Sequence, residues 1–409
     1  MQQIECVYKK KYTYLILFLL LVPSKNNIII ILISSILIFL FPGSTKLNKN
    51  IYFNFGIFMI LYILFSSFIR FFITLSSNYR DFQESMRFLP VILIFARIEE
   101  YKNIKIENFA DAMFVYLIFD GVVSYLQHIK SNIFGINQLI LKFYNSDYQH
   151  SISVQLNNRA IGLSPGPAQH GALLALIFII MLNIFILYDN RKILSVIGSF
   201  LSFLIILSSQ SRTSFVAIIV VSVILFGYYI FKGLRIQKFK IIIIFSIAII
   251  LGLYVIQNYV YLLSIFNPMT RDRAIDIRLS MSNNFINDAF KKPFWLIFGY
   301  GKDFFGKSSA SMDNEYTYIF LVYGIFISLL LIRILIKFLI FTIKLGKQNF
   351  TKYYINLILF FITLTGLIIA FPAAFFIDIK ILIMICLVIC LRHNMFEKNY
   401  NTHSTFSKI

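Results

Sequence analysis

The sequence predicts an all-α protein that crosses a membrane many times, and three observations support this. The 409-residue chain is 59% hydrophobic, with a mean hydropathy of +0.79, whereas a soluble domain is about half apolar. Apolar runs long enough to cross a bilayer recur along the chain. The basic residues, which give a formal net charge of +20, gather between those runs. This is the distribution that the positive-inside rule expects, and it argues against a nucleic-acid-binding domain.

The apolar runs predict twelve spans in a single integral membrane domain, residues 1–409. They lie at about 12–22, 27–42, 51–72, 84–97, 106–128, 168–188, 193–208, 213–231, 240–257, 315–340, 354–371 and 373–391. The first, second and fourth are short, so we expect those helices to be tilted, bent or partly re-entrant.

Basic residues choose the orientation of these spans. Most basic residues lie in short segments on the same side of the membrane as the N-terminus, for example Lys9 to Lys11, Arg191 with Lys192, and Lys344 with Lys347. Both termini are therefore predicted to be cytoplasmic. Two long segments, 129–167 and 258–314, then lie outside, where we expect the protein to act. No clear internal repeat is visible, which weighs against an inverted-repeat transporter.

Arginines mark the predicted outer edge: Arg80, Arg159, Arg212, Arg271, Arg273 and Arg278. Guanidinium groups hold phosphates bidentately and stay charged, so a cluster of them suits a lipid pyrophosphate with about two negative charges. The alternative is that each one reaches out to lipid headgroups. Arg87 follows Arg80 by about two turns and, if buried, is functional by default. His170 opens the sixth span, where a single histidine is more often structural than catalytic.

The stretch from Phe298 to Gly324 combines a Gly-x-Gly turn with an acidic cluster, Asp313-Asn314-Glu315, directly before an apolar helix. We interpret it as the chemical centre of a membrane enzyme. Asp313 is expected either to cap that helix or to act as a general base, with Glu315 as the reserve base.

Other chemistry finds no support in the sequence. Cys6, Cys386 and Cys390 give neither a disulfide framework nor a metal motif. There is no Walker sequence, dinucleotide fingerprint or zinc motif, so we expect no metal and no cofactor. Asp111, Asp120 and Asp378 lie in or at the ends of spans, and each would be a proton-relay residue in a transporter.

Four segments, in this order, resemble the bacterial O-antigen polymerase and ligase superfamily (Wzy and WaaL type). They are RAIGLSPGPAQHGALLALI from Arg159, SSQSRTSFVAIIVVSVILF around Arg212, RLSMSNNFINDAFKKPFWLIFGYG from Arg278, and DNEYTYIFLVYG from Asp313. Ligases usually have a histidine where this chain has Asp313, which favours a polymerase. The Pro-Asn pair of the family is replaced by Pro165-Gly166, which puts any role of that asparagine in doubt.

The resemblance implies a GT-C-type membrane glycosyltransferase in the bacterial inner membrane, active on the outer (periplasmic) face without metal. A growing glycan on polyprenyl pyrophosphate would be transferred, with inversion, to the next lipid-linked repeat unit of an O-antigen, lipopolysaccharide or capsule. Asp313 would activate the acceptor. The substrate-binding set would be Arg80, Arg159, Arg212, Arg273, Arg278, His170, Asn314 and Tyr316. A chain-length regulator would be a further partner. The alternatives are a ligase of the same fold and a flippase for lipid-linked oligosaccharides.

Overall fold

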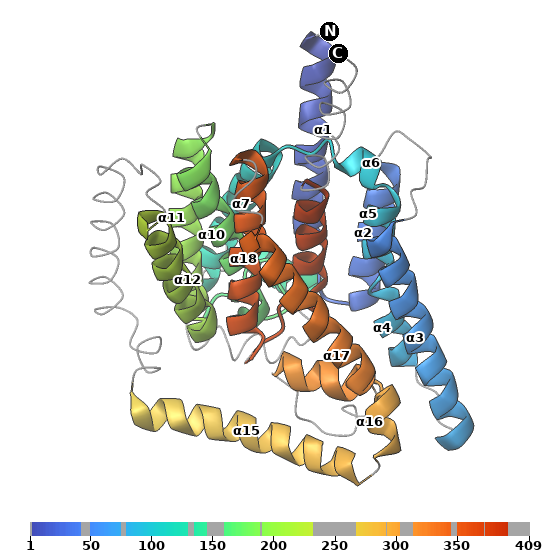
Figure 1. The fold of residues 1–409 in the computed structure, drawn as a ribbon. Coiled ribbons are helices and arrows are strands. Elements are labelled where there is room, and N and C mark those ends of the chain that lie inside the picture. The colour runs from blue at the N-terminus through green and yellow to red at the C-terminus, as the bar shows by residue number, and fades with distance from the viewer. Residues whose placement is uncertain are drawn as a thin grey trace.

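The computed structural model describes residues 2–41, 50–74, 79–129, 135–144, 159–188, 190–231, 267–291, 293–302, 314–344, 350–371 and 373–391. Every regular element in these ranges is a helix (Figure 1), which confirms the all-α prediction for this part of the chain.

Five described helices are long and apolar enough to cross a membrane by length and composition: α3 (Ile51–Thr74), α7 (Ile106–His128), α10 (Pro167–Leu187), α11 (Lys192–Ser209) and α17 (Glu315–Lys344). Shorter apolar helices are α2 (Asn27–Leu40), α12 (Arg212–Phe231), α18 (Phe350–Ile369) and a last helix, Ile379–Leu391. The others are α1 (Gln2–Leu21), α4 (Tyr79–Met86), α5 (Leu89–Ala96), α6 (Ile98–Tyr101), α8 (Ile136–Tyr144), α15 (Pro268–Phe290) and α16 (Phe294–Phe298). The predicted span 240–257 lies outside the described residues.

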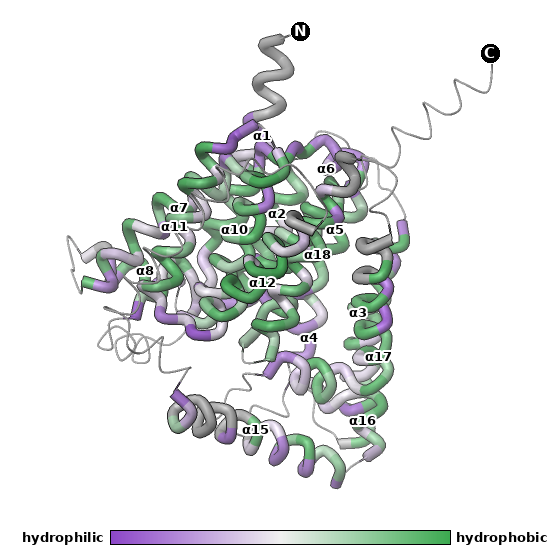
Figure 2. Tube along the Cα trace, turned by 60° about the vertical axis from the view of Figure 1, so that its left-hand side comes forward, coloured by the Kyte–Doolittle hydropathy of each residue, from purple (hydrophilic) through white to green (hydrophobic). Residues whose placement is uncertain are grey.

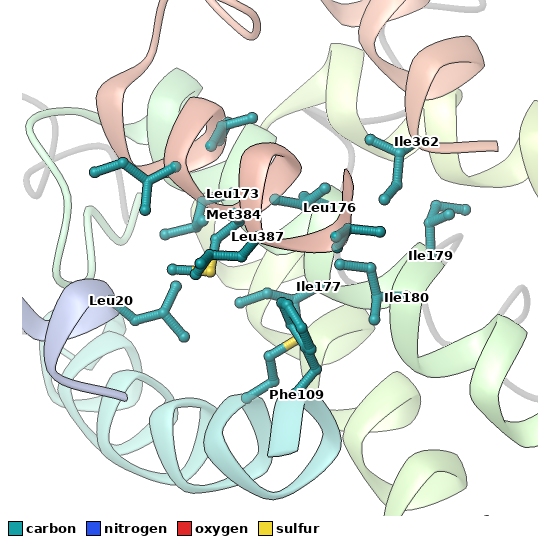
Figure 3. Packing of buried hydrophobic residues seen from close by; sticks show 14 of the residues in the cluster. Leu20, Phe109, Leu173, Leu176, Ile177, Ile179, Ile180, Ile362, Met384 and Leu387 are labelled. Atoms are coloured by element: carbon teal, nitrogen blue, oxygen red, sulfur yellow. The ribbon is translucent and has the colours of Figure 1, made fainter. Parts of the chain in front are cut away.

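Helix α10 is the centre of the main core. It is apolar all round, as a helix surrounded by other helices must be, and Leu176, Ile177 and Ile180 are fully buried. Figure 3 shows Ile177 between Phe109 of α7 and Leu387 of the last helix. Helices α7, α11, α12 and α18 all contact α10. A smaller core joins α3 to α17.

The predicted spans 84–97 and 373–391 are built differently in the structure. The predicted span 84–97 is not one helix: it contains the end of α4 and the whole of α5, two eight-residue helices separated at Arg87 and Phe88. Pro90 lies in the first turn of α5, where a missing N–H costs nothing, and so it favours a new helix start. The final helix begins at Ile379, because residues 373–378 form a connection rather than the start of a span.

The two ends of the bundle differ in character. The start of α1 lies at one end, and α4, α15 and α16 lie at the other (Figure 1). Helix α15 runs across that second end, and Figure 2 shows hydrophilic residues recurring along it, while the upright helices are mainly hydrophobic. The second end is the one that carries the candidate site.

Candidate functional site

A cleft of about 730 Å³ lies where the α1–α2 connection, α4, the start of α10 and the 373–378 connection meet. Its polar lining includes three cations, Lys25, Arg87 and Lys380, and one carboxylate, Asp378. Uncharged polar residues also line it: Ser24, Asn26, Asn27, Tyr79, Gln83, Ser164 and Gln169. This donor-rich, cationic lining is the kind of surface that binds an anion.

One wall of the cleft is the stretch 159–166, the end of the first predicted outer loop. This stretch does not extend into solvent, because Ala160 and Ile161 are buried against the bundle. The Gln127 side chain of α7 accepts hydrogen bonds from the N–H groups of Ile161 and Gly162, both at 2.8 Å. These buried bonds replace the water that backbone groups would otherwise need, and they fix Ser164 at the edge of the cleft.

His170 does not line the cleft but lies behind the stretch 159–166 and supports it. Its Nε2 lies 2.7 Å from Oδ2 of Asp120, and both side chains are fully buried. The other oxygen of Asp120 accepts the N–H of Leu163 at 2.8 Å. Gly162 has φ +56°, and a Cβ atom there would overlap the His170 ring. The position thus needs glycine on both counts. His170, which was predicted to bind substrate, does not line the cleft.

A buried ionic cluster backs the opposite wall. Glu84 of α4 pairs with Arg87 at 2.6 Å and with Nζ of Lys302 at 2.9 Å, and it accepts a hydrogen bond from the Tyr323 hydroxyl. Burial by itself would raise the pKa of Glu84. The charges of Arg87 and Lys302 outweigh it and lower the pKa to about 2. Glu84 is therefore ionised at neutral pH, and it holds the guanidinium of Arg87 at the rim of the cleft.

The Gly-x-Gly turn predicted from the sequence is attached to the same cluster. Arg70 of α3 bonds Asp81 at 2.6 Å and the carbonyl of Gly299 at 2.8 Å. The other oxygen of Asp81 accepts the N–H of Lys302 at 2.8 Å. A Cβ atom on Gly301, which has φ +72°, would lie 2.7 Å from both Arg70 and Asp81. The turn therefore fits against two buried, paired charges because it has no side chain there.

Helix α17 is kinked at Gly324, whose φ of 81° is not helical. A kink leaves carbonyls of the preceding turn without their helical partners. The carbonyls of Leu321 and Val322 accept hydrogen bonds from Tyr300 at 2.7 Å and Gly301 at 3.3 Å. The Gly-x-Gly turn and Gly324 both belong to the stretch from Phe298 to Gly324 that was interpreted as the chemical centre. The structure places them in backbone contact.

The side chain of Glu315, the predicted reserve base, holds a backbone segment in place. Its side chain is buried and accepts the N–H groups of Phe375 at 2.8 Å, Phe376 at 3.1 Å and Ile377. Its own N–H donates to Ala370. A carboxylate whose oxygens bind three backbone donors away from solvent is badly placed to take a proton from a substrate. It instead shapes the 373–378 connection, which leads to Asp378.

The cap of α17 is Asn314, not Asp313. The Asn314 side chain accepts the N–H groups of Tyr316 at 3.0 Å and Thr317 at 3.2 Å, as an N-cap does. The capping interpretation offered for Asp313 thus passes to its neighbour. The Tyr316 hydroxyl donates to the carbonyl of Leu367 at 2.6 Å. Asp313 itself lies outside the described residues.

The arginines expected to bind pyrophosphate do not line this cleft where their side chains are described. Arg80 lies half-buried on α4, Arg159 faces the carbonyl of Ser209 at 3.4 Å, and Arg212 begins α12. Arg273 and Arg278 belong to α15, but their side chains fall outside the described part. The arginine that reaches the cleft is Arg87, which the sequence marked as functional if buried and which is 7% exposed.

Sequence reasoning missed the partners of these charges. Arg70, Asp81, Glu84, Lys302 and Lys380 were not predicted as site residues. The available signal was a charge inside or next to an apolar run, because such a charge needs a partner. The sequence does not say which one, because the partners come from helices far apart in the chain.

Comparisons with protein-family models, with curated proteins and with solved structures find no match to this chain. What the fold defines is a class: an all-helical protein with helices long and apolar enough to cross a membrane.

Proposed function

We propose that this protein is a membrane glycosyltransferase that extends a polysaccharide from polyprenyl-pyrophosphate-linked repeat units. The observation that carries the proposal is the cleft in which Lys25, Arg87 and Lys380 meet a single carboxylate, at the end of the bundle that holds α4 and α15. The motif resemblance adds the substrate class. An O-antigen or capsule repeat unit would be the glycan.

The cleft suits a diphosphate joined to sugars. Its volume of about 730 Å³ lies within the range of about 300–1,000 Å³ of small-molecule sites. Three cations offset the charge of about −2 on a lipid diphosphate. Exposed apolar helices beside the cleft, such as α2 with Ile29 and Leu32 outward, offer the lipid chain an apolar path.

The reaction needs no nucleotide. The acceptor hydroxyl attacks the anomeric carbon, the bond to the diphosphate breaks, and the configuration inverts. Preorganised cations stabilise the charge that develops on the leaving diphosphate. The resemblance implies Asp313 as the base, from the segment 303–313 outside the described residues.

The remaining expectations belong to this proposal as well. We propose twelve spans, a GT-C-type membrane fold in the bacterial inner membrane, cytoplasmic termini and a cleft facing the periplasm. The positive-inside distribution supports the orientation. A chain-length regulator would be a partner outside the cleft.

Reconstitution in vesicles tests the function directly. We expect the purified protein to lengthen lipid-linked repeat units without nucleotide or ion gradient. Arg87→Gln should lower extension by roughly 10²–10³-fold, the effect of removing one preorganised charge at a transition state, and Arg87→Lys should restore part of it. Arg191→Gln is the control, because Arg191 pairs with Asp111 at the opposite end of α7. Arg212→Ala tests the separate prediction from the motif.

The two alternatives give different results in the same assay. A ligase would transfer a finished glycan to another acceptor and would leave repeat units unextended. A flippase would move labelled lipid across the vesicle without lengthening it. Either result, or equal extension by wild type and Arg87→Gln of matched stability, would contradict the proposal.

A further inference from the structure

We propose that Asp378, in place of the Asp313 that the resemblance implies, is the catalytic base of this transfer, the carboxylate that contacts the acceptor hydroxyl and takes its proton. The inference rests on the proposed function and names the residue for its chemical step. It is carried by the cleft and by the charges gathered in it.

Asp378 is the one carboxylate among the described residues that line the cleft. Lys380 lies two residues further on, in the first turn of the last helix, and Arg87 lines the cleft from the end of α4. A carboxylate in a cationic site repels the diphosphate itself, so it lies beside the phosphate position and not on it. The uncharged hydroxyl of an acceptor sugar is the group that it can accept a hydrogen bond from.

The other buried carboxylates near the site are held by structural partners. Those partners are Arg70 for Asp81, Arg87 and Lys302 for Glu84, His170 for Asp120, and three backbone N–H groups for Glu315. Asp378 accepts the N–H of Ile381 at 3.1 Å, which caps the last helix. Its cleft position distinguishes it from the other four.

Its environment also suits proton transfer. Burial raises the pKa of the Asp378 carboxyl, although Lys380 and Arg87 oppose the rise. Tyr116 of α7 is a further titratable neighbour, and Lys25 and Tyr79 face the same cleft. A higher pKa makes a carboxylate a stronger base.

The step balances without another reactant. The acceptor O–H gives its proton to Asp378 as its oxygen forms the new bond to the anomeric carbon. The bond from that carbon to the diphosphate oxygen breaks, and its electron pair leaves with the polyprenyl diphosphate. Lys25, Arg87 and Lys380 stabilise the added charge. The proton then passes from Asp378 to the released diphosphate or to water.

The test separates catalysis from capping. Asparagine and serine cap helices about as well as aspartate, so Asp378→Asn and Asp378→Ser should keep the wild-type melting temperature. Extension in vesicles should fall by roughly 10²–10⁴-fold, the range for loss of a general base. Binding of a labelled polyprenyl-diphosphate oligosaccharide should stay within about twofold of wild type, because the cations remain. Asp111→Asn is the control, because Asp111 lies near the end of α7 that is remote from Gln127 and the cleft. It should extend lipid-linked repeat units at the wild-type rate.

The outcomes divide cleanly. If Asp378→Asn and Asp378→Ser both extend at the wild-type rate, the carboxylate only caps the helix and the inference is wrong, while the proposed function stands. The inference also fails if Asp313→Asn stops extension while Asp378→Asn does not. If the wild-type protein itself extends nothing, it is the proposed function that fails.

Discussion

Glu84 shows how this protein keeps charges in an apolar bundle. It is 1% exposed, and its partners Arg87 and Lys302 come from the α4–α5 junction and from the turn that follows α16. Removing one member of such a group is costly because the opposite charges remain buried without a counter-charge. Each buried charge is therefore both a constraint on the fold and a way to hold a functional charge in place.

Glu84→Gln is expected to lower stability and to change its dependence on pH. The pKa of Glu84 is lowered from 4.5 to about 2 in the folded protein. Ionised Glu84 therefore stabilises the fold fully above pH 4.5, and this contribution is lost progressively as pH falls from 4.5 towards 2. Melting temperature measured in detergent between pH 6 and pH 3 should fall for wild type and stay flatter for Glu84→Gln.

The matched control is Glu107→Gln on α7, because Glu107 meets Asn190 in an exposed contact of 3.2 Å. Its melting curve should follow wild type at every pH. A Glu84→Gln variant with the same stability and pH slope as wild type would show that the buried pair contributes nothing.

At the residue scale the sequence predicted types of residue better than their roles. Arg87 was expected to matter if buried, and it is buried in the cleft wall. His170 and Glu315 were placed in the site, but both hold backbone segments beside it. Sequence spacing cannot reveal this, because Asp120 and the 373–378 connection lie about 50–60 residues away from them.

Among the elements, the kinked helix α17 and the Gly-x-Gly turn form the most constrained contact. Gly324 has φ +81°, and a Cβ atom there would lie 2.6 Å from the N atom of Gly299 and overlap the carbonyl of Ile297. Both are backbone atoms, from the end of α16 and the start of the turn, and Arg70 holds the carbonyl of Gly299. Neither side of the contact has room to move.

Gly324→Ala is therefore expected to be strongly destabilising. The positive φ costs roughly 1–2 kcal/mol for alanine, and relief of the clash adds roughly 1–3 kcal/mol. Extension should fall with stability, because the turn leads into Lys302 and the cluster behind Arg87.

Gly227→Ala in α12 provides the comparison, since a Cβ atom there meets nothing within 4 Å. Alanine in a helix is favoured over glycine by about 1 kcal/mol, so this variant should melt at or above the wild-type temperature. If both glycine variants melted together, the close approach of α17 to the turn would be refuted.

The pattern of apolar residues predicted where most helices lie but not where they are interrupted. Helices α3, α7, α10 and α11 lie within a few residues of the predicted spans. The short fourth span was expected to be tilted, bent or partly re-entrant, but neither the position of the break between α4 and α5 nor the late start of the last helix was predicted, because hydropathy does not register a change of direction. Burial of 159–166 also depends on a partner elsewhere in the chain, the side chains of Gln127 and Asp120.

Over the whole molecule, the exposed apolar surface indicates whether water or hydrocarbon surrounds the protein. Helix α10 is almost entirely inside the bundle, whereas α3 exposes a row of large apolar side chains, with Leu61, Phe65 and Phe68 each more than half exposed. Such a surface is unfavourable in water at about 25 cal/mol per Å² and is matched to hydrocarbon. The cationic cleft lies at one end of this apolar belt, where a lipid with a charged head and an apolar tail would place its head.

The orientation of that end is the last testable property, and cysteine labelling in intact cells measures it. In a Cys6→Ser background, Met269→Cys puts a thiol on α15, where residue 269 is 86% exposed. Asn103→Cys puts one on the exposed connection between α6 and α7, beside Lys102 and Lys105. The native Cys386 and Cys390 are buried and should stay unlabelled. Because the positive-inside rule predicts that the lysine-rich connection is cytoplasmic, a membrane-impermeant maleimide should label position 269 in intact cells and position 103 only after permeabilisation. In the proposed reaction the cleft and α15 face the periplasm, so the reverse pattern would contradict both the orientation and the proposed reaction.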